Sequence, residues 1–187
     1  MKIIFLGTPE FGAINLRRMV EAGYKPELVI TAPDRPAGRG QKMKESTVSK
    51  VAAELNLRVA KPDKLSDLTD EIKEISPSLM VVAAYGQYIP GKIIEISQFG
   101  ILNVHPSLLP KYRGSSPIQY AILNGDKRSG TTIILINKEM DKGDILAQEE
   151  IELSKDETYL SLFEKLTPIG ADLLVQTIPR WLKGEIT

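Results

Sequence analysis

The chain has 187 residues, a length typical of one compact domain, and its 42% hydrophobic and 26% charged residues exclude a disordered, collagen-like or fibrous protein. Lysine plus arginine and aspartate plus glutamate each number 24, so any affinity for nucleic acid needs a local basic patch. The lack of cysteine excludes disulfides, thiolate metal sites and thiol nucleophiles. We therefore expect residues 1–187 to form one domain.

The apolar runs of the sequence are short. Residues 3–6 and 79–84 are strand-sized, far below the roughly 20 residues that a membrane helix needs. Thr8, Pro9 and Glu10 interrupt the N-terminal run before the apolar core of a signal peptide could form. These features exclude a membrane span and a signal peptide. We expect a cytoplasmic protein that acts as a monomer.

In the first half of the chain, short apolar or β-branched runs alternate with longer amphipathic stretches. This pattern predicts strands at 2–6, 27–31, 57–60 and 79–83, and helices at 11–22, 46–56 and 67–75, the last with Ser66 as its N-cap. Such alternation is typical of βαβ units, which favour a parallel sheet.

In the second half, the pattern predicts strands at 100–105, 131–136 and 145–153, and helices at 118–123 and 157–182. The last helix carries apolar residues at helical spacing, so it should cover one face of a sheet. The expected fold class is α/β: a Rossmann-like, mostly parallel twisted sheet with helices on both faces.

Glycines follow the first strand, at Gly7 and Gly12, but they do not form a dinucleotide-binding fingerprint. Pro9 and Glu10 stand where the backbone would have to approach a phosphate closely. The segment therefore predicts a structural turn and no nicotinamide cofactor.

His105 is the only histidine, and it lies at the predicted carboxyl end of a strand, where open α/β sheets place their ligands. Because side chains alternate along a strand, Asn103 and His105 should project from the same face. A lone histidine at a strand end is more often structural than catalytic, so spacing alone does not decide its role.

The residues that follow make the pattern specific. The segment Asn103-Val104-His105-Pro106-Ser107-Leu108-Leu109-Pro110 is followed by Arg113-Gly114 and by Asp141-Lys142-Gly143-Asp144. Together they resemble the Asn…His…Asp signature of the 10-formyltetrahydrofolate-dependent formyltransferases. The resemblance extends over essentially the whole chain and implies the formyltransferase fold.

The resemblance implies a reaction in which an amine attacks the formyl carbon of the folate and leaves as a formamide. Asn103 would donate its amide N–H to the developing oxyanion, and His105 would shuttle the proton. Asp141 would orient the imidazole. Asp144 is a rival carboxylate on the residues alone, and the family pattern selects Asp141; no metal is needed.

The resemblance assigns the formyl-folate co-substrate, 10-formyltetrahydrofolate, to Ser107, Leu108, Leu109 and Pro110. The plain alternative is a tight turn that joins a strand to a helix, and the two roles are compatible. Both this segment and the segment 33–45 lie in long, turn-rich connections of the kind that often carry function.

The segment 33–45 carries a compact cationic cluster formed by Arg35, Arg39, Lys42 and Lys44. A solvated connection is the plain alternative. Further segments resemble the family members that act on initiator methionyl-tRNA: 7–11, 33–40, 84–86 and 116–119. The cationic cluster would then contact phosphates at the tRNA end, with salt-dependent affinity.

Other acceptors and one other class of function stay open. A formyltransferase acting on an amino-sugar nucleotide or on glycinamide ribonucleotide would share Asn103, His105 and Asp141, and the basic segment favours tRNA over both. A non-catalytic folate- or tRNA-binding module would not need these three residues. The tRNA-specific members carry a C-terminal barrel domain that helps to bind tRNA, and we expect that this chain lacks it.

Overall fold

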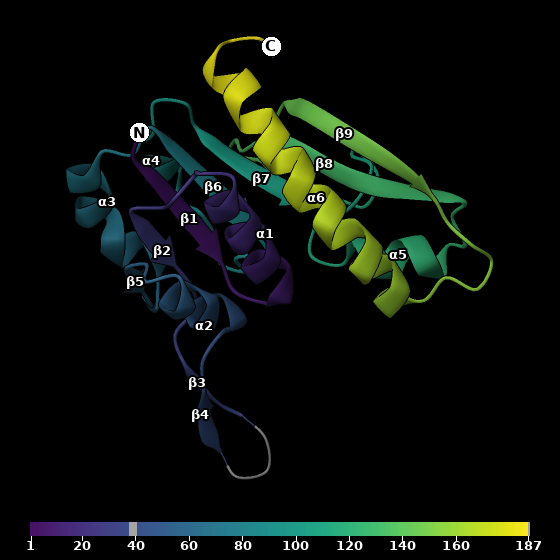
Figure 1. Ribbon diagram of the computed structural model, residues 1–187, viewed down its shortest axis with the longest axis horizontal. Helices are drawn as coiled ribbons and strands as arrows, with labels where there is room; N and C mark the ends of the chain where they lie inside the picture. The colour runs from purple at the N-terminus through teal and green to yellow at the C-terminus, as the bar shows by residue number, and fades with distance from the viewer. Residues whose placement is uncertain (38–40, 187) are drawn as a thin grey trace. The chain divides into compact units, whose positions relative to one another are not determined.

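The computed structural model describes residues 1–37 and 41–186, which fold into two compact units (Figure 1). We call Met1–Ile101 unit 1 and Leu102–Thr187 unit 2. Each unit has its own helices and strands.

Unit 1 contains four parallel strands in the order β5-β2-β1-β6. Their bounds are Ile3–Gly7 for β1, Leu28–Ile30 for β2, Val59–Ala60 for β5 and Leu79–Ala83 for β6. Every residue of β1 and β6 is buried, which is why both read as continuous apolar runs rather than as alternating patterns.

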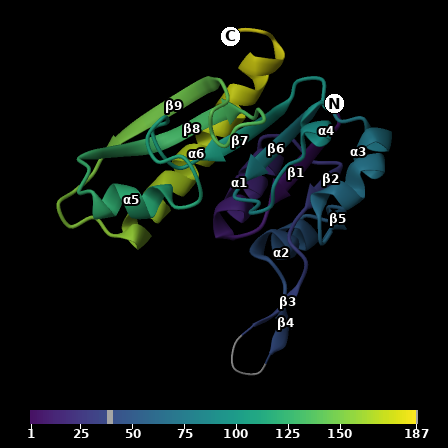
Figure 2. The ribbon, with the colours of Figure 1, turned by 180° about the vertical axis from the view of Figure 1, so that it is seen from behind.

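The helices of unit 1 cover both faces of these strands (Figure 2). Right-handed crossovers place α1 (Glu10–Glu21) and α2 (Thr47–Glu54) on one face, and α3 (Thr69–Ile75) and α4 (Gly91–Ile94) on the other. The α/β class predicted from the sequence is confirmed.

The turn between β1 and α1 is structural in unit 1. A Cβ atom at Gly12 would lie 2.7 Å from the carbonyl oxygen of Ala83, so only glycine lets α1 approach β6 this closely. The Thr8 hydroxyl donates to the carbonyl of Tyr85 over 2.8 Å and ties this turn to the segment after β6.

Ser66 is not the N-cap that the sequence suggested. A short 3₁₀ turn, Leu65–Leu68, comes before α3, and α3 begins at Thr69 with Leu68 before it. The Ser66 carbonyl instead accepts the Thr69 hydroxyl hydrogen bond at 2.6 Å. Helix α2, by contrast, is capped by Ser46, whose hydroxyl accepts the Ser49 N–H at 2.9 Å.

Within the segment 33–45, part of the expected loop is a hairpin. Strands β3 (Arg35–Ala37) and β4 (Lys42–Lys44) pair antiparallel, with Arg35 opposite Lys44. Figure 1 shows the hairpin reaching away from the other strands of unit 1.

Unit 2 is antiparallel. Strands β7 (Ile101–His105, of which only Ile101 belongs to unit 1), β8 (Arg128–Leu135) and β9 (Ile145–Glu152) pair in that order, so the parallel pattern expected from the first half does not continue here. Helices α5 (Pro117–Leu123) and α6 (Tyr159–Leu182) complete the unit. Ile118 and Ala121 of α5 form a small core with Leu162 and Leu166 of α6.

Helix α6 covers one face of β8 and β9, as the views from both sides show (Figures 1 and 2). Gly170 allows the close approach: a Cβ atom there would lie 3.0 Å from side-chain carbons of both Thr131 and Val104. Over residues 1–37 and 41–186, no helix combines the length and apolarity required to cross a membrane.

Candidate active site

Asn103 and His105 lie on β7 of unit 2 and project from the face opposite α6. Val104 between them points toward α6, where it lies beside Gly170, so strand alternation turns its two neighbours the other way. His105 is buried at 5% exposure, and Asn103 is partly buried. The predicted placement of these two side chains on one face agrees with this geometry.

Both ring nitrogens of His105 face oxygen atoms. Nε2 lies 2.9 Å from the carbonyl oxygen of Tyr112, and Nδ1 lies 3.8 Å from Oδ2 of Asp141. A carbonyl only accepts hydrogen bonds, so this contact assigns a hydrogen to Nε2. In the neutral ring Nδ1 then presents its lone pair toward the carboxylate, and the pair becomes an ion pair only when Nδ1 is also protonated.

Asp141 is held in place by the segment that follows β7. The Gly114 N–H donates to Asp141 Oδ2 over 2.8 Å, and Arg113 Nε donates to the Asp141 carbonyl over 3.1 Å. The Asp141 backbone has φ +49°, in the left-handed region that aspartate tolerates better than most residues. The carboxylate is therefore directed toward His105 by local backbone contacts.

The rival carboxylate lies elsewhere. Asp144 is exposed, and its backbone carbonyl accepts the Leu135 N–H at 2.9 Å. Gly143 between them closes the turn: a Cβ atom there would lie 1.6 Å from the Leu135 carbonyl oxygen, which no side chain permits. Of the two carboxylates, Asp141 is the one beside the imidazole.

The segment Ser107 to Pro110 is anchored by two side chains that the sequence did not single out. The fully buried Thr132 hydroxyl donates to the Ser107 carbonyl over 2.6 Å and accepts the Leu109 N–H over 3.1 Å. Gln148 Nε2 donates to the Leu109 carbonyl over 2.8 Å and to the Thr132 hydroxyl over 2.9 Å. These contacts fix the backbone of a segment that begins the connection from β7 to α5, and the folate role stays a prediction.

The other two residues of the segment 107–110 are Leu108 and Pro110. Leu108 lies over Gly130 of β8, where a Cβ atom would be 2.5 Å from the leucine side chain. Pro110 is exposed, and its peptide bond with Leu109 is cis. No group of three or more histidine, aspartate or glutamate side chains suited to a metal ion occurs in the described part of the chain.

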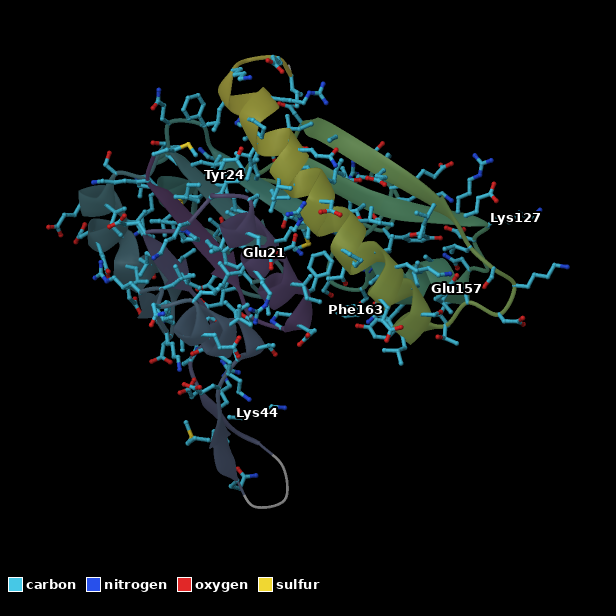
Figure 3. All side chains as sticks on the ribbon, viewed as in Figure 1. Glu21, Tyr24, Lys44, Lys127, Glu157 and Phe163 are labelled. Carbon is cyan, nitrogen blue, oxygen red and sulfur yellow. The ribbon has the colours of Figure 1, made fainter. Side chains whose placement is uncertain are left out.

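The predicted cationic cluster belongs to unit 1. Arg35 and Lys44 are exposed on the β3–β4 hairpin, where Figure 3 labels Lys44. Arg39 lies outside the described residues, and for Lys42 only the backbone position in β4 is described. Of the four cations that the sequence groups together, the structure describes the side chains of two, Arg35 and Lys44.

These two cations line a cavity of about 470 Å³ at the carboxyl ends of β1, β2 and β6. Its wall also includes Thr8, Glu45, Ser46 and Gln87. Tyr85 lies in the same wall, and burial raises the pKa of its phenol to about 12. Sequence reasoning placed Arg35 and Lys44 in this region but did not predict the cavity.

Comparison with known proteins identifies the family. The family described as "Formyl transferase" matches residues 1–178. The chain is 45% identical to the methionyl-tRNA formyltransferase of Lactobacillus gasseri over 187 residues, which cover 99% of this chain and 60% of that protein. The chain thus spans about three fifths of the length of this relative.

Solved structures share the fold. A phosphoribosylglycinamide formyltransferase from Bacillus halodurans superimposes with a TM-score of 0.82 at 21% identity, covering 97% of this chain and 95% of that one. An N-formyltransferase from Helicobacter canadensis, in complex with folinic acid and dTDP-3-aminofucose, gives 0.76 at 22% identity, covering 100% and 66%. The fold and the sequence match agree, and the chain belongs to the formyl transferase family.

Proposed function

We propose that this protein transfers the formyl group of 10-formyltetrahydrofolate to the amino group of initiator methionyl-tRNA in the cytoplasm, with residues 1–187 as the catalytic domain. The observation that carries the chemistry is the His105 imidazole set between the Tyr112 carbonyl and the Asp141 carboxylate, two residues after Asn103 and on the same strand face. The identity to a methionyl-tRNA formyltransferase over 99% of the chain supports the acceptor.

In the proposed reaction the amine nitrogen attacks the formyl carbon and a tetrahedral intermediate forms. The negative charge that develops on the formyl oxygen is stabilised by the Asn103 amide, which donates a hydrogen bond to it. Among the described residues the Asn103 side chain has no hydrogen-bonding partner, so its N–H groups are available to a substrate. The bond from carbon to the folate nitrogen then breaks.

The proton released by the amine has to reach the departing folate nitrogen. His105 Nε2 is held by the Tyr112 carbonyl, so the lone pair on Nδ1 is the site that accepts this proton. The resulting imidazolium lies beside Asp141, whose Oδ2 is 3.8 Å from Nδ1 and balances the new charge. The ring then returns the proton to the leaving nitrogen, so no net proton remains on the enzyme.

The folate role proposed for Ser107 to Pro110 is supported by their position. They follow His105 after one residue, Pro106, and Thr132 and Gln148 fix their backbone on the same face of unit 2. The Helicobacter canadensis relative binds folinic acid, a reduced folate, which supports a folate as the co-substrate here. The assignment of 10-formyltetrahydrofolate as the formyl donor is supported by the match to the formyl transferase family.

The cations of the segment 33–45 are proposed to contact tRNA phosphates. Arg35 and Lys44 are exposed and face each other across the hairpin, which suits an extended anionic ligand. Arg39 and Lys42 belong to the same proposal on the sequence alone.

One assay tests the function. The protein is incubated with 10-formyltetrahydrofolate and, separately, with methionyl-tRNA, glycinamide ribonucleotide and an amino-sugar nucleotide, and formylated product is measured. Formylation of methionyl-tRNA is expected, with the His105→Ala variant as the inactive control. Transfer only to one of the small acceptors would contradict the proposed acceptor, and transfer to none would contradict the proposed activity.

A further inference from the structure

Lys61 links the two ends of the β3–β4 hairpin. It follows β5 directly, and its Nζ donates to Asp34 Oδ1 over 2.7 Å, to Asp34 Oδ2 over 3.0 Å and to Glu45 Oε1 over 2.9 Å. Asp34 comes immediately before β3, and Glu45 immediately after β4. One ammonium group therefore joins the chain where it enters the hairpin to the chain where it leaves.

This cluster is partly shielded from water. The side-chain exposures of Lys61 and Asp34 are 27% and 29%, and that of Glu45 is 50%. Burial by itself lowers the pKa of Lys61, but the hydrogen bonds to Asp34 and Glu45 outweigh it and leave the pKa above its ordinary value. Lys61 thus stays charged, and its single positive charge offsets one of the two negative charges while its ammonium group donates hydrogen bonds to both carboxylates.

The two carboxylates are sequence neighbours of the two exposed cations: Asp34 precedes Arg35, and Glu45 follows Lys44. All four side chains are at the base of the hairpin, and Arg35, Lys44 and Glu45 line the cavity of about 470 Å³. Without Lys61 the carboxylates are free to pair with these cations and to repel an anionic ligand.

We propose that Lys61 is a positioning residue for acceptor binding: it fastens both ends of the hairpin through Asp34 and Glu45 and so leaves Arg35 and Lys44 available to phosphates of the acceptor. This inference rests on the proposed function, because it concerns how methionyl-tRNA is held. Lys61 itself does not contact the reacting atoms in this scheme, and its effect is transmitted by the hairpin.

The test compares three variants with wild type. Lys61→Met removes the ammonium group but keeps most of the side-chain length, and Lys61→Arg restores a cation that can bridge two carboxylates. Arg17→Met is the matched control, since it breaks the ion pair of Arg17 with Glu54, a 2.6 Å contact on the surface of unit 1 outside the cavity wall. Thermal unfolding of each variant checks that it is folded.

Two measurements are made. Steady-state formylation of methionyl-tRNA should show KM raised about tenfold in Lys61→Met with kcat little changed, since a shielded, hydrogen-bonded ion cluster is lost. Amide hydrogen exchange of the free protein should be faster by about tenfold at the hairpin amides of residues 35, 37 and 42–44. Lys61→Arg should restore most of both properties, and Arg17→Met should match wild type.

The outcomes separate the two proposals. If wild type formylates methionyl-tRNA but Lys61→Met has the KM and the hairpin exchange of Arg17→Met, the inference fails while the function stands. If KM rises equally in Lys61→Met and Lys61→Arg, the bridging role fails. If wild type does not use methionyl-tRNA, the proposed function fails and takes the acceptor role of Lys61 with it. Should Lys61→Met be unfolded, Asp34→Ala combined with Glu45→Ala removes both acceptors of the same contacts, and its hairpin exchange decides the question.

Discussion

Replacing Asp141 with asparagine tests the proposed mechanism most directly. The substitution keeps the shape of the side chain and leaves an oxygen to accept the hydrogen bond that the Gly114 N–H donates to Asp141 Oδ2 over 2.8 Å in wild type. It removes only the negative charge that lies 3.8 Å from His105 Nδ1. The local fold of the turn should therefore persist while the ion pair with a protonated ring is lost.

The size of the effect follows from the distance. At 3.8 Å, with an effective dielectric constant of about 20, the attraction of the two charges is roughly 4 kcal/mol. Asp141 is 15% exposed, so water recovers part of this energy, and we expect a loss of about 2 to 4 kcal/mol in the transition state. That loss lowers the rate of formyl transfer by about 30- to 1,000-fold.

The assay is single-turnover transfer from 10-formyltetrahydrofolate to methionyl-tRNA, with thermal unfolding measured in parallel. Asp144→Asn is the matched control, because it makes the same change in charge on the exposed neighbour of the same turn. The reasoning is refuted if folded Asp141→Asn transfers at the wild-type rate, or if Asp144→Asn is impaired to the same extent.

Three further predictions concern other groups. Asn103→Ala should lower kcat by about a hundredfold or more while folate binding, followed by titration, is retained; near-normal turnover would remove Asn103 from the mechanism. Hydrogen bonds from Lys165 and then Ser161 lower the pKa of Glu157, labelled in Figure 3, from 4.5 to about 2. Because the pKa is lower in the folded state, the stabilisation is present above about pH 4.5 and is lost as the pH falls toward 2, so Glu157→Gln should reduce the free energy of unfolding by about 1 kcal/mol at pH 7 and by almost nothing near pH 2. A difference in urea unfolding that does not change with pH would contradict this. Within the described residues the buried Tyr85 hydroxyl has no hydrogen-bond partner, so Tyr85→Phe should raise the free energy of unfolding by up to about 1 kcal/mol at pH 7. Burial raises the pKa of Tyr85 from 10.0 to about 12, so wild type should also lose stability relative to this variant between those pH values. A Tyr85→Phe variant that is less stable than wild type at neutral pH would contradict the first of these two expectations.

The buried strands could be predicted from the sequence because their apolar runs are uninterrupted. β6 was placed at the residues where it lies, and β1 was displaced by one position. The hairpin of β3 and β4 was missed because its strands have three residues each, too few to show an alternating pattern, and α4 was missed because four residues are too few to show a helical period. The antiparallel pairing in unit 2 depends on contacts between distant residues, which no local pattern records.

The candidate site was predictable to a similar degree. Asn103 and His105 could be placed on one face from strand alternation alone, whereas Asp141 was selected by its resemblance to a family pattern. Thr132 lies directly opposite His105 in the pairing of β7 with β8, and that register has to be known before the threonine can be recognised as an anchor. Lys61 was missed for the same reason, since Asp34 is 27 positions away in the sequence.

The way in which the hairpin is attached has an evolutionary consequence. β3 and β4 pair only with each other, so a change in their length or composition disturbs none of the ladders of the main strands. The hairpin is thus a place where insertions and replacements cost little stability, provided that a counterpart of Lys61 and its two carboxylates is kept. Among relatives that formylate different amines, this segment should diverge faster than the buried strands β1 and β6.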